Sequence, residues 1–229
     1  MDIGKSFSFV FQDDDWIVKL LIGAGILLAG LLLSWLIIPV FLAGFLLSGY
    51  GVEITRRVMR GEAPALPVWD NWGKLFTDGL LVWIIGLVYA LPLIVFGLCI
   101  GTPIGAINDE VLASLLGSWL GCLNLLWVIV MSFLLPPAIG LFVKEDDLGA
   151  AFRFGEIFGL IRDNFTTYLI TVLMAWVAYI IGWAGVIVCG FGWLLTAPYA
   201  VFVTGHLYGQ AFLEVSGQAP QAVVEEESA

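Results

Sequence analysis

The amino-acid sequence predicts an all-α, polytopic transmembrane helical bundle of about six spans, with short interfacial helices on the cytoplasmic side. Two observations support this prediction. Hydrophobic residues make up 61% of the chain and charged residues only 12%, whereas a soluble domain carries about 25% charged residues. The apolar residues also gather in four long blocks, at 16–52, 79–100, 111–143 and 165–213. A helix needs about 20 such residues to cross a bilayer.

The four blocks divide into six predicted spans. The first block is too long for one helix that rises about 1.5 Å per residue, and Pro39 favours a second helix start because proline is common in the first turn. In the last block, the glycine-containing segment 189–193 separates two spans. The predicted spans are 16–34, 39–58, 79–100, 112–135, 165–187 and 194–213. For residues 16–52, a re-entrant element remains the alternative to two spans.

The positive charges lie on one side of this arrangement. All nine Lys and Arg residues fall in the N-terminus, in the 53–78 and 144–164 segments, or at span ends that face them. The positive-inside rule therefore predicts a multi-pass protein of the cell membrane with both termini in the cytoplasm. Residues 1–214 form a single transmembrane domain in this prediction, and 215–229 an acidic, disordered cytoplasmic tail. Arg56 and Arg57 are expected to extend from a span end to the interface.

Two segments of the chain resemble each other at a constant offset. "FLAGFLLSGYGVE" at 41–53 aligns with "FVTGHLYGQAFLE" at 202–214. Each holds small residues four positions apart, Gly44 and Ser48 in the first and Gly205 and Gly209 in the second, a spacing that lets membrane helices approach closely. We predict that the two helices are structural counterparts that pack together through these four residues.

Aromatic residues mark a second pair of similar segments, "WGKLF" at 72–76 and "FGEIF" at 154–158. Tryptophan is enriched at membrane–water interfaces, and amphipathic helices lie along them. Both segments precede a predicted outgoing span, so they are expected to lie on the membrane surface. The predicted interfacial anchors are Trp69, Trp72, Phe76, Phe154 and Phe158.

Several motifs, in the same order and at the same spacing, are similar to those of a known family. They are "MDIGKSFSFVFQDDDWIVKLLIGA" at the N-terminus, "GYGVEITRRVMRGE" and "LPVWDNWGKLFTDGL" in the first half, and "FGEIFGLIRDNFTTYLI" in the second. Together they resemble an uncharacterised prokaryotic membrane-protein family, the domain of unknown function numbered 4013, over the chain up to about residue 215. The resemblance implies an integral membrane protein of bacteria or archaea. It brings no known activity and no catalytic residues.

Residues that carry chemistry are sparse in the predicted spans. Asn124 and His206 are the polar side chains singled out there, and a lone histidine on an apolar helix is most often a hydrogen-bonded packing residue. The three cysteines have no metal-ligand spacing, and each is expected to be a buried thiol. No nucleophile, phosphate-binding or zinc-protease motif is present. The sequence therefore predicts no enzyme activity, no metal site and no cofactor.

Two functional classes remain. The first is a non-catalytic scaffold or accessory subunit that binds protein or lipid partners, which the lack of charged residues inside the spans favours. The alternative is a small-molecule transporter or channel without an obvious ion-coupling site, which the repeat and the prolines in the spans favour. The expected partners are the lipid bilayer and a membrane protein or a second copy of the chain. The net charge of −10 gives no reason to expect nucleic acid.

Overall fold

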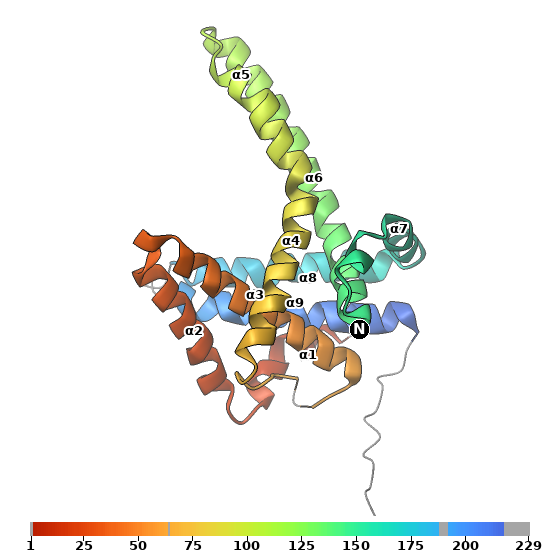
Figure 1. Ribbon diagram of the computed structural model, residues 1–229. Coiled ribbons are helices and arrows are strands. Elements are labelled where there is room, and N and C mark those ends of the chain that lie inside the picture. The colour runs from red at the N-terminus through yellow and green to blue at the C-terminus, as the bar shows by residue number, and fades with distance from the viewer. Residues whose placement is uncertain (1, 64, 188–191, 218–229) are drawn as a thin grey trace, which may run out of the picture.

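The computed structural model describes residues 2–63, 65–187 and 192–217. Within these ranges all regular structure is helical, which confirms the predicted all-α class. The chain begins with α1 (Ile3–Ser8) and the short helix η1 (Phe9–Gln12), followed by α2 (Trp16–Leu32). The first two elements and α2 enclose an angle of 93°, so the N-terminal segment lies across the bundle instead of extending α2 (Figure 1).

The long N-terminal apolar block forms two separate helices. After α2, the turn η2 (Ser34–Leu36) reverses the chain into α3 (Ile38–Arg60). Ile37 makes the reversal with φ of 65°, and Pro39 occupies the first turn of α3, as expected for a residue whose φ suits a helix start. The two helices then pack closely, because Gly30 leaves room for Ala43.

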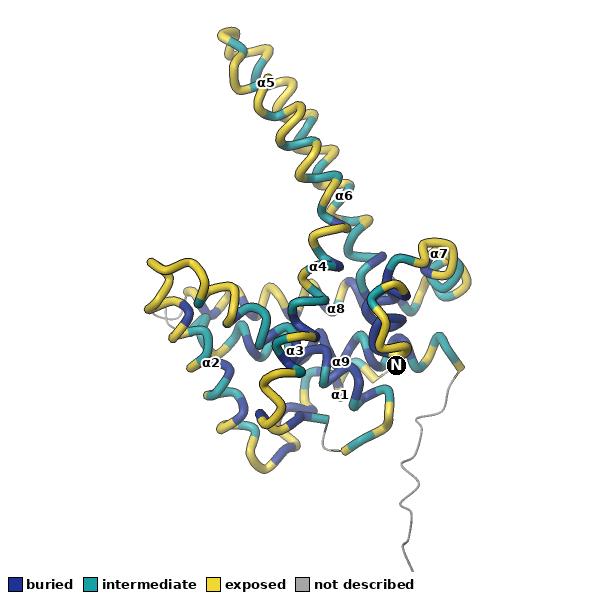
Figure 2. The backbone as a smooth tube through the Cα atoms, in the orientation of Figure 1, coloured by how far each residue is buried: buried dark blue, intermediate teal, exposed yellow. Residues whose placement is uncertain are grey.

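A long helical hairpin extends from the body of the molecule (Figure 1). Its first arm is α4 (Trp72–Phe96), continued by η3 (Gly97–Gly101) and α5 (Thr102–Gly105). Its second arm is α6 (Glu110–Glu145), which starts where Asp109 accepts hydrogen bonds from two backbone N–H groups at 3.0 Å, a standard N-cap arrangement. The outer half of the hairpin is largely exposed (Figure 2).

The C-terminal half forms the centre of the bundle. It contains η4 (Leu148–Phe152), α7 (Phe154–Asp163), α8 (Phe165–Ala184) and α9 (Trp193–Ser216). Helix α9 lies beside α8 and also packs against α2 and α3. Most side chains between Pro198 and Phe212 are buried, so α9 is a central helix of the bundle.

The structure gives four or five candidate membrane spans where the sequence predicts about six. Four segments are long and apolar enough: α3, Trp72–Gly105, α6 and α8; a fifth arises if the bent N-terminal pair is one span. The predicted span 16–34 is α2, which has only 17 residues. The predicted span 194–213 is α9, in which polar residues such as His206 and Gln210 interrupt the apolar sequence. Residues 189–191 of the predicted turn at 189–193, and residues 218–229 of the predicted acidic tail, lie outside the described residues.

Candidate functional site

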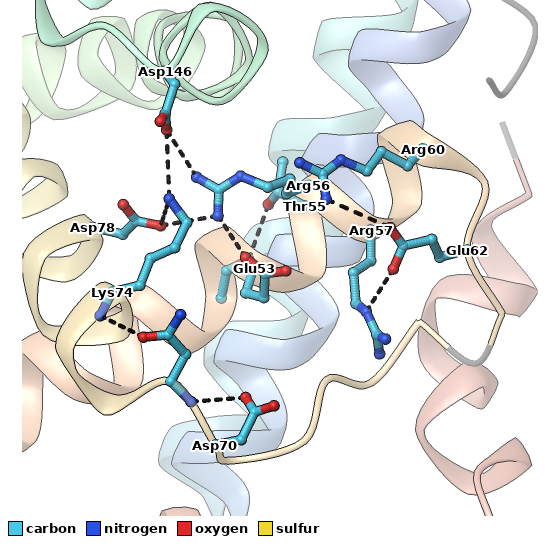
Figure 3. A network of polar contacts seen from close by, with 12 residues as sticks. Glu53, Thr55, Arg56, Arg57, Arg60, Glu62, Asp70, Lys74, Asp78 and Asp146 are labelled. Atoms are coloured by element: carbon cyan, nitrogen blue, oxygen red, sulfur yellow. Dashed lines mark hydrogen bonds and ion pairs between the residues drawn. The ribbon is translucent and has the colours of Figure 1, made fainter. Parts of the chain in front are cut away.

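A buried arginine joins three helices at one end of the bundle. Arg56, on α3, has a side chain only 6% exposed. Its guanidinium donates to Glu53 at 2.5 Å, to Asp78 of α4 at 2.9 Å and to Asp146, just after α6, at 3.3 Å (Figure 3). A buried charge is tolerated only when it is paired and hydrogen-bonded. The expectation that Arg56 extends to the interface is therefore wrong, because three carboxylates hold it inside.

Further ion pairs surround this buried centre. Lys74 lies 3.7 Å from both Asp78 and Asp146. On the other side, Glu62 accepts a hydrogen bond of 2.8 Å from Arg57 and lies 3.6 Å from Arg60 (Figure 3). Ion pairs longer than about 3.2 Å are not tight hydrogen bonds. Arg56 and Arg57 therefore make short hydrogen bonds to carboxylates, whereas Lys74 and Arg60 make only longer ion pairs.

An open pocket of about 350 Å³ lies against this network, between the end of α3 and the start of α4. The connecting segment forms its wall and is fixed through its backbone. The carbonyl oxygen of Leu66 accepts from Arg57 at 2.9 Å and from Lys19 at 3.2 Å, and that of Pro67 accepts from the Tyr50 hydroxyl at 2.7 Å. A loop held by three side-chain donors gives the pocket a defined shape.

A second buried ion pair lies next to the segment that connects α3 and α4. Lys19, on α2, donates to Asp13 at 2.6 Å, and both side chains are buried. The backbone carbonyl of Lys19 accepts a hydrogen bond of 3.1 Å from the Trp69 indole. The Trp69 ring also stacks on Tyr50, with ring centroids 4.1 Å apart.

The five predicted interfacial anchors occupy different environments. Trp69 is only 7% exposed, so it is a core residue and presents almost no surface to a membrane. Trp72, Phe154 and Phe158 are exposed, and Phe76 is half-buried against Phe45. The anchoring role of these four residues stays a prediction.

The two predicted interfacial helices also differ. Residues 72–76 form the first turns of α4 itself, so no separate surface helix precedes that span. Residues 154–158 do lie on a short separate helix, α7. Its start is tied to the end of α6 by Arg153, which lies 2.6 Å from Glu145. Hydrogen bonding to the Glu145 carboxylate raises the pKa of Arg153 above its ordinary value.

Gly205 and Gly209, on α9, face α3. A Cβ atom at Gly205 would lie 2.5 Å from the carbonyl oxygen of Gly51, and one at Gly209 would lie 2.7 Å from Cβ of Val58. The hydroxyl of Thr55 crosses the same interface and donates to the carbonyl of Gly205 at 2.9 Å. Backbones approach this closely only where side chains are absent.

Gly44 and Ser48 lie elsewhere, against α4. The Trp83 ring covers Gly44, and its indole N–H donates to the Ser48 hydroxyl at 3.0 Å. Sequence reasoning also missed the tightest crossing, where Gly49 lies against the backbone of Leu75 and Gly79 against that of Phe45. Small residues four positions apart indicate that one face of a helix allows close packing. They do not indicate which helix packs against that face.

The two predicted polar residues inside spans also differ. His206 is buried, its Nδ1 lies 3.0 Å from the Ser6 hydroxyl, and its ring stacks on Phe9 at 4.2 Å. It therefore fastens the N-terminal segment to α9. Asn124 is half-buried on α6, and its side-chain oxygen has no partner within the described ranges. Cys99 and Cys122 are exposed in the hairpin, not buried as expected.

A smaller cavity of about 110 Å³ is lined by residues of α3, α4, α6, α8 and α9. Its described lining includes five hydroxyl-bearing residues, namely Ser48, Thr55, Tyr179, Thr204 and Tyr208, and no charged residue. A search for three or more His, Cys, Asp or Glu residues that could hold a metal ion finds no such group in the part of the chain that the structure describes. The charged pocket beside Arg56 is therefore the chemically richest site found there.

Several apolar helices are long enough to cross a bilayer, and a buried ion network ties α3, α4 and the end of α6 together at one end of the bundle, an arrangement consistent with a multi-pass α-helical membrane protein. The chain belongs to the family described as a protein of unknown function, DUF4013, whose model matches residues 32–191. A comparison with curated proteins found no match, and a comparison with solved structures found none either.

Proposed function

We propose that this protein is a non-catalytic membrane scaffold or accessory subunit that binds a membrane-protein partner or a second copy of itself. The observation that supports this most is the α4–α5–α6 hairpin. Its outer half exposes large apolar side chains, among them Leu98, Val111, Leu115, Trp119 and Leu126. A hairpin that extends beyond its own bundle has little intramolecular packing to hold it (Figure 2), so contacts from outside are expected to complete its stabilisation.

One face of this hairpin also suits a helical partner. Gly117 and Gly121 lie one turn apart on α6, and a Cβ atom at either would meet no atom of the chain within 4 Å. Exposed glycines at this spacing allow close approach of another helix. The buried charges support a structural role as well, because the buried Arg56 and Lys19 are each matched by carboxylates. They leave little unpaired chemistry for catalysis.

We further propose that the protein resides in the cell membrane with both termini in the cytoplasm. The distribution of the nine cations favours this orientation. Asp146 supports it independently, because its ion pairs with Arg56 and Lys74 bring the segments after α3 and after α6 to the same end of the bundle. Two loops that meet in this way belong on one side of a membrane.

The alternative, a transporter or channel, is favoured by one observation: the cavity of about 110 Å³ lined by hydroxyl groups. Ligand pockets typically measure about 300–1,000 Å³, so this cavity suits a few water molecules better than a solute. We therefore rank the transporter second.

The scaffold proposal is tested by site-specific crosslinking in native membranes. A photoreactive residue at Ser118, between the two exposed glycines, is expected to give a product of one defined mass. The same residue at Trp35, in the exposed turn between α2 and α3, serves as the matched control and is expected to give none. Crosslinking to lipid alone at Ser118 would contradict the proposal.

A variant of the same face sharpens the test. Gly117→Leu with Gly121→Leu is expected to abolish the Ser118 product while leaving the isolated protein as stable as before, since neither side chain would meet its own chain. Gly97→Leu with Gly105→Leu, also in open space, provides the matched control. Equal crosslinking from both double variants would mean that no partner packs on this face.

A further inference from the structure

The pocket beside Arg56 carries both signs of charge. Its charged lining residues are four cations, Arg56, Arg57, Arg60 and Lys74, and three anions, Glu53, Glu62 and Asp70. A site for a simple anion would present mainly cations, because carboxylates repel the ligand. The mixture instead suits a ligand that itself carries a negative and a positive group close together.

Two cations that line the pocket, Arg60 and Lys74, retain donor capacity. Arg60 lies 3.6 Å from Glu62 and has a side chain 54% exposed. Lys74 lies 3.7 Å from its carboxylates and has a side chain 40% exposed. Figure 3 shows the two on opposite sides of the network. At these distances their N–H groups are not committed to short hydrogen bonds, so each can donate to a phosphate oxygen of a ligand.

Asp70 offers the complementary acceptor. It is exposed, and its Oδ1 accepts a hydrogen bond of 2.7 Å from the backbone N–H of Asn71. The second carboxylate oxygen can accept from an ammonium group. Figure 3 shows Asp70 on the connecting segment, away from the three carboxylates that hold Arg56.

One of the exposed residues that line the pocket is apolar. This residue, Val68, is 60% exposed, and Trp72, which lies in the sequence between the lining residues Asn71 and Lys74, is exposed at the start of α4. The pocket also lies where two candidate membrane spans, α3 and the α4 arm, end. Exposed apolar side chains next to a charged pocket at a span end suit a molecule with a charged head and an apolar tail.

We propose that this pocket binds the headgroup of a zwitterionic phospholipid, in which a phosphodiester is joined to a primary ammonium. Arg60 and Lys74 donate to the phosphate, and Asp70 accepts from the ammonium. The loop held by Lys19, Arg57 and Tyr50 gives the pocket its shape before the lipid arrives. The inference does not depend on the scaffold role, since a lipid can occupy this pocket whether or not a partner occupies the hairpin.

The test is native mass spectrometry of the full chain released from mild detergent, with three lipids of identical acyl chains added in turn. Phosphatidylethanolamine carries the primary ammonium, phosphatidylcholine has no N–H on its nitrogen, and phosphatidylglycerol has no nitrogen. Phosphatidylethanolamine is expected to bind at least about tenfold more tightly than the other two. Equal binding of all three would overturn the proposal.

Variants locate the site. Arg60→Gln with Lys74→Gln is expected to weaken phosphatidylethanolamine binding by about tenfold or more; Arg153→Gln, an exposed cation paired with Glu145, is the control and should leave it unchanged. Asp70→Asn is expected to remove the preference over phosphatidylglycerol while lipid binding persists. Binding unaffected by the double variant would overturn the assignment, provided that its melting temperature matches that of the wild type.

The source of the headgroup is distinguished by competition. Glycerophosphoethanolamine, which has the headgroup without acyl chains, is expected to displace the lipid only at a concentration at least about a hundredfold higher, because it lacks the apolar contribution of the acyl chains. Displacement at equal concentration would assign the pocket to a soluble compound and overturn the lipid assignment. If Arg60→Gln with Lys74→Gln proves unstable, Arg60→Lys, which keeps the charge, is expected to retain the lipid preference.

Discussion

Arg56 of α3 donates a hydrogen bond of 2.9 Å to Asp78 of α4, and both side chains are almost completely buried. The two residues are 22 positions apart, separated by the loop that forms the charged pocket. Their contact fixes the distance between the end of one helix and the start of the next. The shape of the pocket therefore depends on the buried ion pair of Arg56 and Asp78.

Removing the arginine from this pair should destabilise the protein. Arg56→Met leaves Asp78 buried without its main partner, and breaking a buried ion pair costs about 3–5 kcal/mol. The measurement is the free energy of unfolding in detergent micelles. Arg60→Met, at an exposed position of the same helix, is expected to change it by less than about 1 kcal/mol. Arg56→Met combined with Asp78→Leu should recover part of the lost stability. Equal losses for Arg56→Met and Arg60→Met would contradict the central role of Arg56.

The close contact between α9 and α3 predicts opposite effects for two Gly→Ala substitutions. Gly205→Ala places a methyl group 2.5 Å from the carbonyl oxygen of Gly51, and overpacking costs about 1–3 kcal/mol. Gly86→Ala on α4 meets no atom within 4 Å and should stabilise by up to about 1 kcal/mol through helix propensity. Thermal unfolding of the two variants provides the comparison, and a loss at Gly86 as large as at Gly205 would show that packing is not the cause.

Topology can be read from three single cysteines in a cysteine-free background. Positions Lys5, Asn108 and Asp147 are all exposed. With both termini in the cytoplasm, an impermeant thiol reagent applied to intact cells should label only the cysteine at 108. Labelling at Lys5 together with Asn108, but not at Asp147, would mean that the segment before α4 crosses the membrane an odd number of times. Permeabilised cells, in which all three positions react, are the control.

The backbone conformation of Ile37 leads us to expect that glycine at this position is tolerated or stabilising. Its φ of 65° is costly for a β-branched residue but natural for glycine. Ile37→Gly should therefore raise the free energy of unfolding by about 1 kcal/mol or leave it unchanged, as relief of strain offsets the greater entropy of the unfolded chain. Ser34→Gly, in the same turn at an ordinary φ, should lower it. A clear loss for Ile37→Gly would mean that its side chain is needed for packing.

The sequence by itself determined the helical class and the positions of the main helices. The predicted spans 39–58, 79–100 and 165–187 overlap α3, α4 and α8 over most of their length, because an apolar run and its Gly or Pro boundaries are local properties. The identity of the family also followed from local motifs, although its match covers residues 32–191 and not the chain up to 215.

Only the tertiary structure decided which residues meet. The burial of Trp69, the three carboxylates around Arg56 and the partners of Gly44 and Gly205 all depend on how the helices cross. Between helices in lipid, the hydrophobic effect does not favour one neighbouring helix over another. Close packing at small residues and specific hydrogen bonds therefore determine which helices pair. Such contacts join residues far apart in the sequence, 150 positions between Thr55 and Gly205 and 200 between Ser6 and His206. A periodicity within one helix holds no information about the surface it will meet.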